Sequence, residues 1–405
     1  MSTLIIILLC LFLAYIFSNL CRHLNIPRVI GQIAVGLLLG IPVIKTMMFD
    51  NTSLSMIESL AQIGVILLFF FIGLEIDMGI FKRDFKEASY ISLFNTTLPL
   101  LLGFVVCNFL LGFSVTASLV IAISLSVSAQ SVSIDFLEEL RLLKTRIGNL
   151  IITGGAVDDI FELLLISIVF LFIEGTTSQY GFLKLIVELF IFTIIILIFK
   201  IYVIPMILHS AESEKSTATL FMGALIIVLL MAALAEFLHV GALVGALFAG
   251  LTVRRILLDG KDKKPWEEHL ISNTIHIIAF GFLVPMFFIW IGLTTDVPSI
   301  IDNIWLAIIF FAIACVGTIG GTILGVMRAK GSFNEGLLIG IGLNPKGDVE
   351  LVLAAFALQA GIISKGVFSA LVLMAIATTL ISPVLFRYII MKEHILKKIK
   401  AGLKL

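Results

Sequence analysis

The stretch from Thr153 to Glu162 reads Thr-Gly-Gly-Ala-Val-Asp-Asp-Ile-Phe-Glu and lies inside an otherwise apolar run, residues 147–173. At about 1.5 Å per helical residue, Asp158 and Asp159 lie about 17 Å from the start of that run. A bilayer's hydrocarbon core is about 30 Å thick, so both carboxylates fall near its centre. Acids at that depth are costly and by default mark a functional site. The pair therefore predicts an intramembrane ion site.

The composition is typical of a polytopic membrane protein. Hydrophobic residues make up 60% of the chain and charged residues 13%, which excludes an ordinary soluble domain. The net charge is zero, so no nucleic-acid partner is predicted. The sequence has no phosphate-binding glycine loop, zinc-type histidine pair or nucleophile elbow. We therefore expect neither an enzyme nor a cofactor, and transport has to be driven by an ion gradient.

Charge clusters and turn residues divide the chain into apolar segments that are long enough to be membrane-spanning helices. We expect an all-α fold with thirteen such helices, a count that the basic residues support below. The segments are residues 3–21, 28–44, 56–76, 88–111, 115–138, 147–173, 181–208, 216–237, 240–258, 268–295, 300–327, 333–362 and 366–390.

Lysine and arginine indicate the orientation of these helices. All but four of the 27 basic residues lie in or beside the connections after odd-numbered segments, or toward the C-terminus. The opposite side carries only Lys45, Lys184 and Lys365, and Lys346 lies within a segment. Because basic residues are retained on the cytoplasmic side, this asymmetry predicts a multi-pass protein of the cell membrane with its N-terminus outside and its C-terminus in the cytoplasm.

The sequence also contains an internal repeat. Gly31 and Gly40 of the second segment match Gly241 and Gly250 of the ninth, and a Gly-Leu-x-x-Asp motif beginning at Gly73 recurs in the tenth. Seven segments separate equivalent ones, an odd offset that inverts the second copy, as in many secondary transporters. We predict a single transporter unit, 1–405, with two inverted five-helix repeats. The repeats are residues 28–174 and 240–390, with 1–27 and 175–239 as extra and linking helices.

Two segments at equivalent places in the repeats contain helix-breaking or polar residues. In the fifth, Ser128, Gln130 and Ser131 belong to a crowded polar centre. In the twelfth, Asn-Pro-Lys-Gly-Asp-Val-Glu, residues 344–350, interrupts an apolar run, and Pro345 removes a backbone donor. We expect two crossed broken helices whose facing half-helix dipoles are compensated by polar and charged side chains.

The acids and the lysine carry the expected chemistry. Two neighbouring carboxylates with little water cannot both ionise cheaply, so the pair can hold either a proton or a monovalent cation. Glu162 shares their helix face and is either a third ligand, an outer gate or a neutral hydrogen-bonding acid. An intramembrane Lys346 requires an acidic partner. The candidates for that partner are Asp158, Asp348 and Glu350.

At these residues the chain resembles the cation:proton antiporter superfamily, in the branch of Kef-type potassium efflux systems and bacterial sodium/proton antiporters. The motifs that carry the resemblance are Ala156-Val157-Asp158-Asp159, Gly73-Leu74-Glu75 and Pro345-Lys346-Gly347-Asp348. The resemblance implies a homodimer whose core domain, which holds the broken helices, moves like an elevator against a dimerisation domain. It also implies that Asp159 binds the transported cation and the proton, with Asp158 as its neighbour.

One departure from the family bears on stoichiometry. Electrogenic members have a lysine in the helix before the second broken one, and here that place falls near Gly317-Thr318-Ile319-Gly320. The absence of the lysine favours one-for-one exchange. We therefore predict a sodium/proton antiporter, with K⁺/H⁺ exchange on the same fold as the alternative. A gated cation channel fits less well, because inverted repeats with paired acids favour alternating access.

Overall fold

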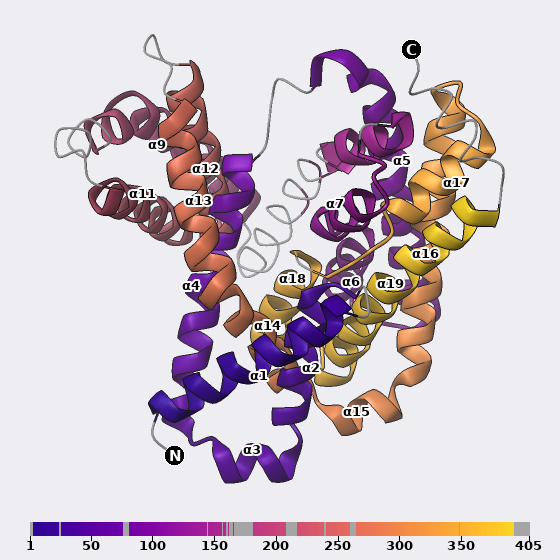
Figure 1. Cartoon of the computed structure of the whole chain (residues 1–405), viewed down its shortest axis with the longest axis horizontal. Coiled ribbons are helices and arrows are strands. Elements are labelled where there is room, and N and C mark those ends of the chain that lie inside the picture. The colour runs from indigo at the N-terminus through magenta and orange to yellow at the C-terminus, as the bar shows by residue number, and fades with distance from the viewer. Residues whose placement is uncertain are drawn as a thin grey trace. The chain divides into compact units, whose positions relative to one another are not determined.

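In the computed structural model, all regular elements formed by the described residues are helices (Figure 1). Among them, eight helices are long and apolar enough to cross a membrane, or nine when a pair bent by 81° counts as one. The prediction of an all-helical membrane protein is confirmed, whereas the count of thirteen stays a prediction. The structure describes residues 3–23, 26–75, 81–143, 145–155, 157–158, 161, 165, 181–207, 217–238, 240–259, 265–347 and 349–392.

The chain divides into two compact units. The first comprises Met1–Ala14, Thr46–Ile76 and Ser167–Trp290, and the second comprises Tyr15–Lys45, Asp77–Ile166 and Ile291–Leu405. The division into sequence repeats is a separate matter and stays a prediction.

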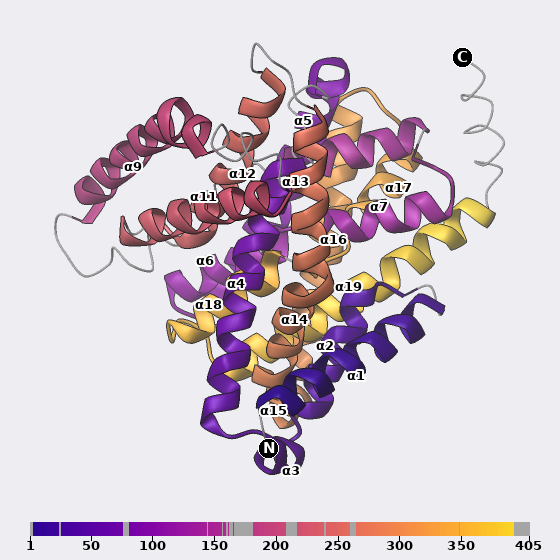
Figure 2. The ribbon, with the colours of Figure 1, turned by 60° about the vertical axis from the view of Figure 1, so that its left-hand side comes forward.

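In the first unit, α11, α12 and α13 gather around α4 (Figure 2). Short π-helical turns extend α9 and separate α13 from α14. The elements of this unit, some of which run past its limits, are α1 (Thr3–His23), α4 (Asn51–Glu75), α9 (Gly181–Ile198), α11 (Thr217–Phe237), α12 (Ala242–Asp259), α13 (Pro265–Ile278) and α14 (Val284–Thr294).

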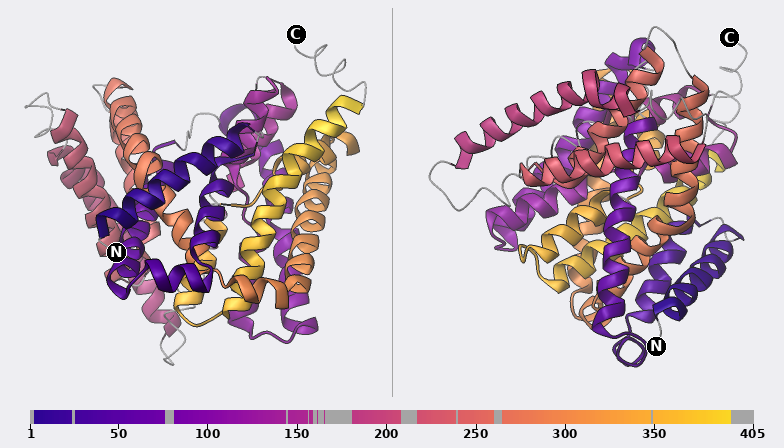
Figure 3. Two further views of the ribbon diagram at one scale, coloured as in Figure 1. Left: turned by 60° about the horizontal axis from the view of Figure 1, so that its bottom comes forward. Right: turned by 90° about the vertical axis from the view of Figure 1, so that its left-hand side faces the viewer.

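In the second unit, α16 packs along α5, α17 and α19 (Figure 1 and Figure 3). A further helix, residues 146–155, leads to Asp158. The other elements are α2 (Arg28–Leu39), α3 (Pro42–Met48), α5 (Phe81–Val105), α6 (Val115–Ser126), α7 (Gln130–Glu139), α15 (Val297–Asp302), α16 (Ile304–Arg328), α17 (Phe333–Gly342), α18 (Val349–Gln359) and α19 (Lys365–Lys392).

The two expected helix breaks are present. The fifth segment is helical as α6, unwinds over residues 127–129 and resumes as α7, and the twelfth unwinds between α17 and α18. Pro345 lies in the second break and cannot donate the backbone hydrogen bond that a continuous helix needs. A direct backbone hydrogen bond of 2.7 Å, from Ala129 N to Pro345 O, joins the two breaks.

Glycines allow close helix approach at corresponding places in the two units. In the first unit, a Cβ on Gly73 of α4 would lie 2.3 Å from the carbonyl oxygen of Leu247 in α12. In the second unit, a Cβ on Gly292 of α14 would lie 2.5 Å from the backbone nitrogen of Leu37 in α2. Any larger side chain at either glycine would force the backbones apart.

The contact between α5 and α16 is equally close, and it yields a test of the packing. A Cβ on Gly321 of α16 would lie 2.2 Å from the Phe94 carbonyl oxygen, whereas one on Gly320 would lie 3.6 Å from the Leu98 side chain. We expect Gly321→Ala to lower the free energy of unfolding by about 1–3 kcal/mol, because overpacking displaces backbone. Gly320→Ala is the matched control. Thermal unfolding in detergent measures both, and equal stability would contradict the packing.

Candidate functional site

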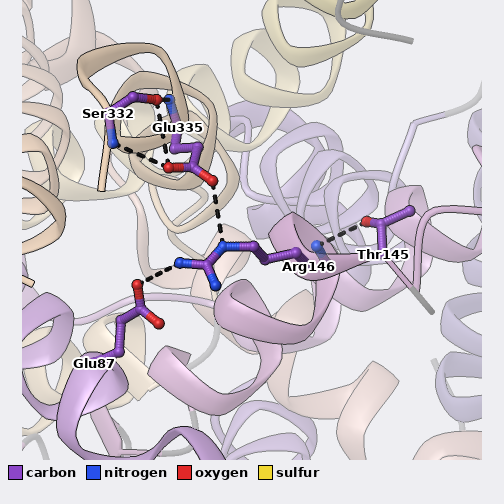
Figure 4. A network of polar contacts seen from close by, with 6 residues as sticks. Glu87, Thr145, Arg146, Ser332 and Glu335 are labelled. Atoms are coloured by element: carbon purple, nitrogen blue, oxygen red, sulfur yellow. Dashed lines mark hydrogen bonds and ion pairs between the residues drawn. The ribbon is translucent and has the colours of Figure 1, made fainter. Parts of the chain in front are cut away.

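The helix that carries Asp158 is anchored at its first turn. Gly148 N donates to the Thr145 hydroxyl at 3.1 Å, a local cap for the helix start. Arg146 forms ion pairs with Glu87 of α5 at 2.6 Å and with Glu335 of α17 at 3.3 Å (Figure 4). Because the Arg146 side chain is 59% exposed, each pair contributes little to stability. The network nevertheless links the start of this helix to the N-terminal parts of α5 and α17.

Asp158 is fully buried, and its carboxylate accepts hydrogen bonds from one face of α5. Oδ1 accepts from the Ser92 hydroxyl at 2.8 Å and from the Thr96 hydroxyl at 2.6 Å. Oδ2 accepts from the Asn95 amide. Asn95 and Thr96 lie three and four residues after Ser92 on α5, the spacing that places them on its side of the helix. The three donors replace the water that a carboxylate loses on burial.

Further polar groups contact Asn95, one of the three donors to Asp158. The Thr322 hydroxyl of α16 donates to Asn95 Oδ1 at 3.1 Å, and the Asn95 amide also reaches Ser128 Oγ at 3.5 Å. Asn95 and Thr322 are fully buried. These groups therefore connect Asp158 both to α16 and to the unwound segment after α6.

The two helix breaks satisfy each other's backbone groups. Lys346, from the second break, donates through Nζ to the Ser126 carbonyl at the end of α6, at 3.3 Å. Ser133 of α7 donates to the Gly342 carbonyl at the end of α17, at 2.6 Å. A helix leaves its last carbonyls unpaired and its C-terminus partly negative, so both contacts stabilise these ends. The expected compensation of half-helix dipoles is therefore present at Ser126.

Lys346 is itself held by polar groups. The side chain is fully buried, and Nζ donates to the Thr318 hydroxyl of α16 at 3.3 Å. Its own carbonyl accepts from Thr379 of α19. Thr318 lies in the stretch where electrogenic relatives were expected to carry their lysine, so here a positive charge reaches the same neighbourhood from the helix break.

Of the other expected site residues, some lie near Asp158 or support its helix, and others lie outside the described residues. Ser128 is one of the polar groups that contact Asn95, as described above. Gln130 donates to the Ile152 carbonyl at 2.8 Å and packs against Gly155, so it braces the helix that precedes Asp158. Glu350 is buried in the first turn of α18, where a carboxylate complements the positive helix end. Asp159, Glu162 and Asp348 lie outside the described residues, as does the side chain of Ser131.

Several residues of the site were not expected from the sequence. They are polar side chains on α5 and α16, two helices that read as apolar spans. The α5 residues do carry a signal, since polar positions spaced by three and four define one face of a helix. The missed residues are Ser92, Asn95, Thr96, Thr318 and Thr322.

The polar groups around Asp158 are hydroxyl, amide and carboxylate groups. Within the described ranges, no group of three or more His, Cys, Asp or Glu side chains could hold a metal ion. The oxygen atoms around Asp158 suit a hard monovalent cation better than a transition metal.

Comparison with known proteins gives consistent matches over nearly the whole chain. The model of the family described as "Sodium/hydrogen exchanger, transmembrane" matches residues 7–392. A Na⁺/H⁺ antiporter of Enterococcus hirae is 29% identical over 393 residues, which cover 96% of this chain and 98% of that protein. The Na⁺/H⁺-K⁺ antiporter GerN of Bacillus cereus is 25% identical and covers 92% of each chain.

A solved structure resembles the fold. The structure of the sodium proton antiporter MjNhaP1 from Methanocaldococcus jannaschii superposes with a TM-score of 0.67. It covers 94% of this chain and 95% of its own, at 15% sequence identity. The arrangement of helices is therefore similar even though few residues are shared.

The capping of α6 by Lys346 can be tested by substitution. Lys346→Met leaves the Ser126 carbonyl without this donor, so we expect the free energy of unfolding to fall by about 2–3 kcal/mol. Lys330→Met, at an exposed position after α16, is the control for loss of a lysine. Thermal unfolding in detergent compares them, and a Lys346→Met protein as stable as the control would contradict the capping role.

Proposed function

The chain belongs to the transmembrane sodium/hydrogen exchanger family, and from that premise we propose that it exchanges Na⁺ for H⁺ by alternating access at Asp158 and Asp159. Members of this family are transporters and not enzymes. The observation that carries the proposal is the Asp158 carboxylate, fully buried beside two joined helix breaks. A site of this kind fits an ion carrier, because buried acids are retained in membrane helices for function.

The two acids have different tasks in this proposal. Asp158 is held by three donors from α5 and is the fixed member of the pair. Asp159 is the ligand that exchanges a proton for the cation, with Ser128, Gln130, Ser131 and Lys346 as supporting residues. Glu162, Asp348 and Glu350 complete the proposed acidic environment. Na⁺ and a proton compete for the same carboxylate, so the binding of one releases the other.

The glycine contacts support the inverted repeat. The repeat matches Gly73 with Gly292, and it matches the start of α12 with α2. Gly73 packs against Leu247, while its counterpart Gly292 packs against Leu37, which is the repeat partner of Leu247. The repeat thus maps the contact between α4 and α12 onto the contact between α14 and α2, as expected of a transporter with a pseudo-two-fold axis.

The two compact units support an elevator-like movement. Ser92, Asp158 and Lys346 all belong to the second unit, so one body contains the described site. A carrier of this kind moves its site as a rigid body against a second one. In the proposed arrangement the first unit forms the contact of a homodimer in the cell membrane, with the N-terminus outside and the C-terminus in the cytoplasm.

Potassium is the second candidate ion. GerN, a relative at 25% identity, is named as a Na⁺/H⁺-K⁺ antiporter, and hydroxyl and carboxylate oxygens suit either ion. A gated channel remains the less favoured alternative.

The role of Asp159 is tested first. We expect Asp159→Asn to abolish cation-dependent proton flux in proteoliposomes, because an amide cannot exchange a proton for a cation. Asp302→Asn, at an exposed position ending α15, is the control and should exchange at the wild-type rate. Appreciable exchange by Asp159→Asn would contradict the assignment.

Ion choice and stoichiometry are tested together. Dye quenching with Na⁺, Li⁺, K⁺ and Rb⁺ side by side should show the strongest proton movement with Na⁺. Because Thr318 lies where electrogenic relatives have lysine, we expect one-for-one exchange that does not respond to an imposed membrane potential. A voltage-dependent equilibrium would overturn that stoichiometry, and single-channel currents would favour the channel.

A further inference from the structure

The hydrogen bonds to Asp158 leave the carboxylate little freedom as a ligand. A carboxylate offers about four acceptor positions, two on each oxygen. Ser92 and Thr96 occupy Oδ1, and Asn95 occupies one position on Oδ2. The described donors thus leave a single acceptor position, and it is on Oδ2. The direction of this remaining acceptor position on Asp158 depends on the orientation of the Asn95 amide.

The Asn95 amide is held from both sides, by Asp158 and by Thr322. Asn95 Oδ1 accepts from the Thr322 hydroxyl at 3.1 Å, and the amide nitrogen is turned toward Asp158. The flipped amide would place its oxygen against the carboxylate, which can only accept, whereas the Thr322 hydroxyl can bond either amide atom. Both side chains are fully buried, so bulk water does not compete for these contacts. The Asp158 carboxylate therefore sets the amide orientation, and the Thr322 hydroxyl holds the amide in it.

From this chain of contacts we propose that Asn95 is a positioning residue of the exchange site. Held by Thr322, it orients Asp158 so that one acceptor position on Oδ2 remains for the transported cation. This inference rests on the proposed exchange function and deepens it. It divides the work between the acids, because Asp158 contributes one oriented ligand and Asp159 has to supply the rest of the carboxylate coordination.

The sharpest test is a pair of substitutions at Thr322. Thr322→Val keeps the shape of the side chain but removes the hydroxyl that holds Asn95, whereas Thr322→Ser keeps the hydroxyl. We expect Thr322→Val to raise the apparent KM for Na⁺ about tenfold, the usual effect of losing a group that orients a metal ligand. The maximal exchange rate should be unchanged, because the altered interaction is made equally in the bound and transition states. Thr322→Ser should restore the wild-type KM.

A double substitution distinguishes positioning from a general packing effect. Asn95→Ala should raise the KM at least as much as Thr322→Val. If Thr322 acts through Asn95, adding Thr322→Val to Asn95→Ala should change nothing further. Thr97→Val is the control on α5, because the Thr97 hydroxyl is exposed and bonds its own helix at Leu93 O. That variant should match wild type in both KM and rate.

The outcomes separate this inference from the proposed function. Exchange by wild type with an unchanged KM in Thr322→Val would overturn the positioning role alone. Fully additive effects in the double variant would overturn it too, because they would show independent actions. If wild-type proteoliposomes showed no cation-dependent proton flux at all, the proposed function would fail, and the inference with it.

Discussion

The burial of one carboxylate is the constraint on which the second unit depends. A charged Asp158 without water is costly, and the cost is offset only by donors placed at both of its oxygens. Those donors come from α5, so the Asp158 helix and α5 have to keep one fixed relation. The close contact of α5 with α16 then brings Thr322 to Asn95. The hydrogen bonds around Asp158 therefore depend on the close glycine packing between α5 and α16.

The helix breaks solve a second electrostatic problem in the same region. Unwinding two spans inside a membrane protein exposes carbonyls that have no water to bind. Here each broken span supplies a donor to the other, Lys346 to Ser126 and Ser133 to Gly342, and a backbone bond joins them. Because these contacts are reciprocal, one break cannot rearrange without disturbing the other. The two breaks are consequently tied together next to the proposed exchange site.

The family comparison places these details in context. The helical arrangement is shared with MjNhaP1 at only 15% identity, so many sequences satisfy the same fold. The buried cation comes from the break at Lys346, and Thr318 lies where the family resemblance led us to look for a lysine on α16. In the proposed function, the number of protons exchanged per cation depends on local charges of this kind.

The sequence by itself determined the membrane setting, most helical segments, the acidic pair and both helix breaks, because hydropathy, charge and proline act locally along the chain. It predicted that Lys346 would compensate a helix end but left its partners open. Only the tertiary structure decided that Ser92, Asn95 and Thr96 surround Asp158. Polar residues at helical spacing define a face without saying what that face meets. The partner of that face is decided by contacts between helices far apart in sequence. Here the α5 donors have to offset the burial of the Asp158 charge.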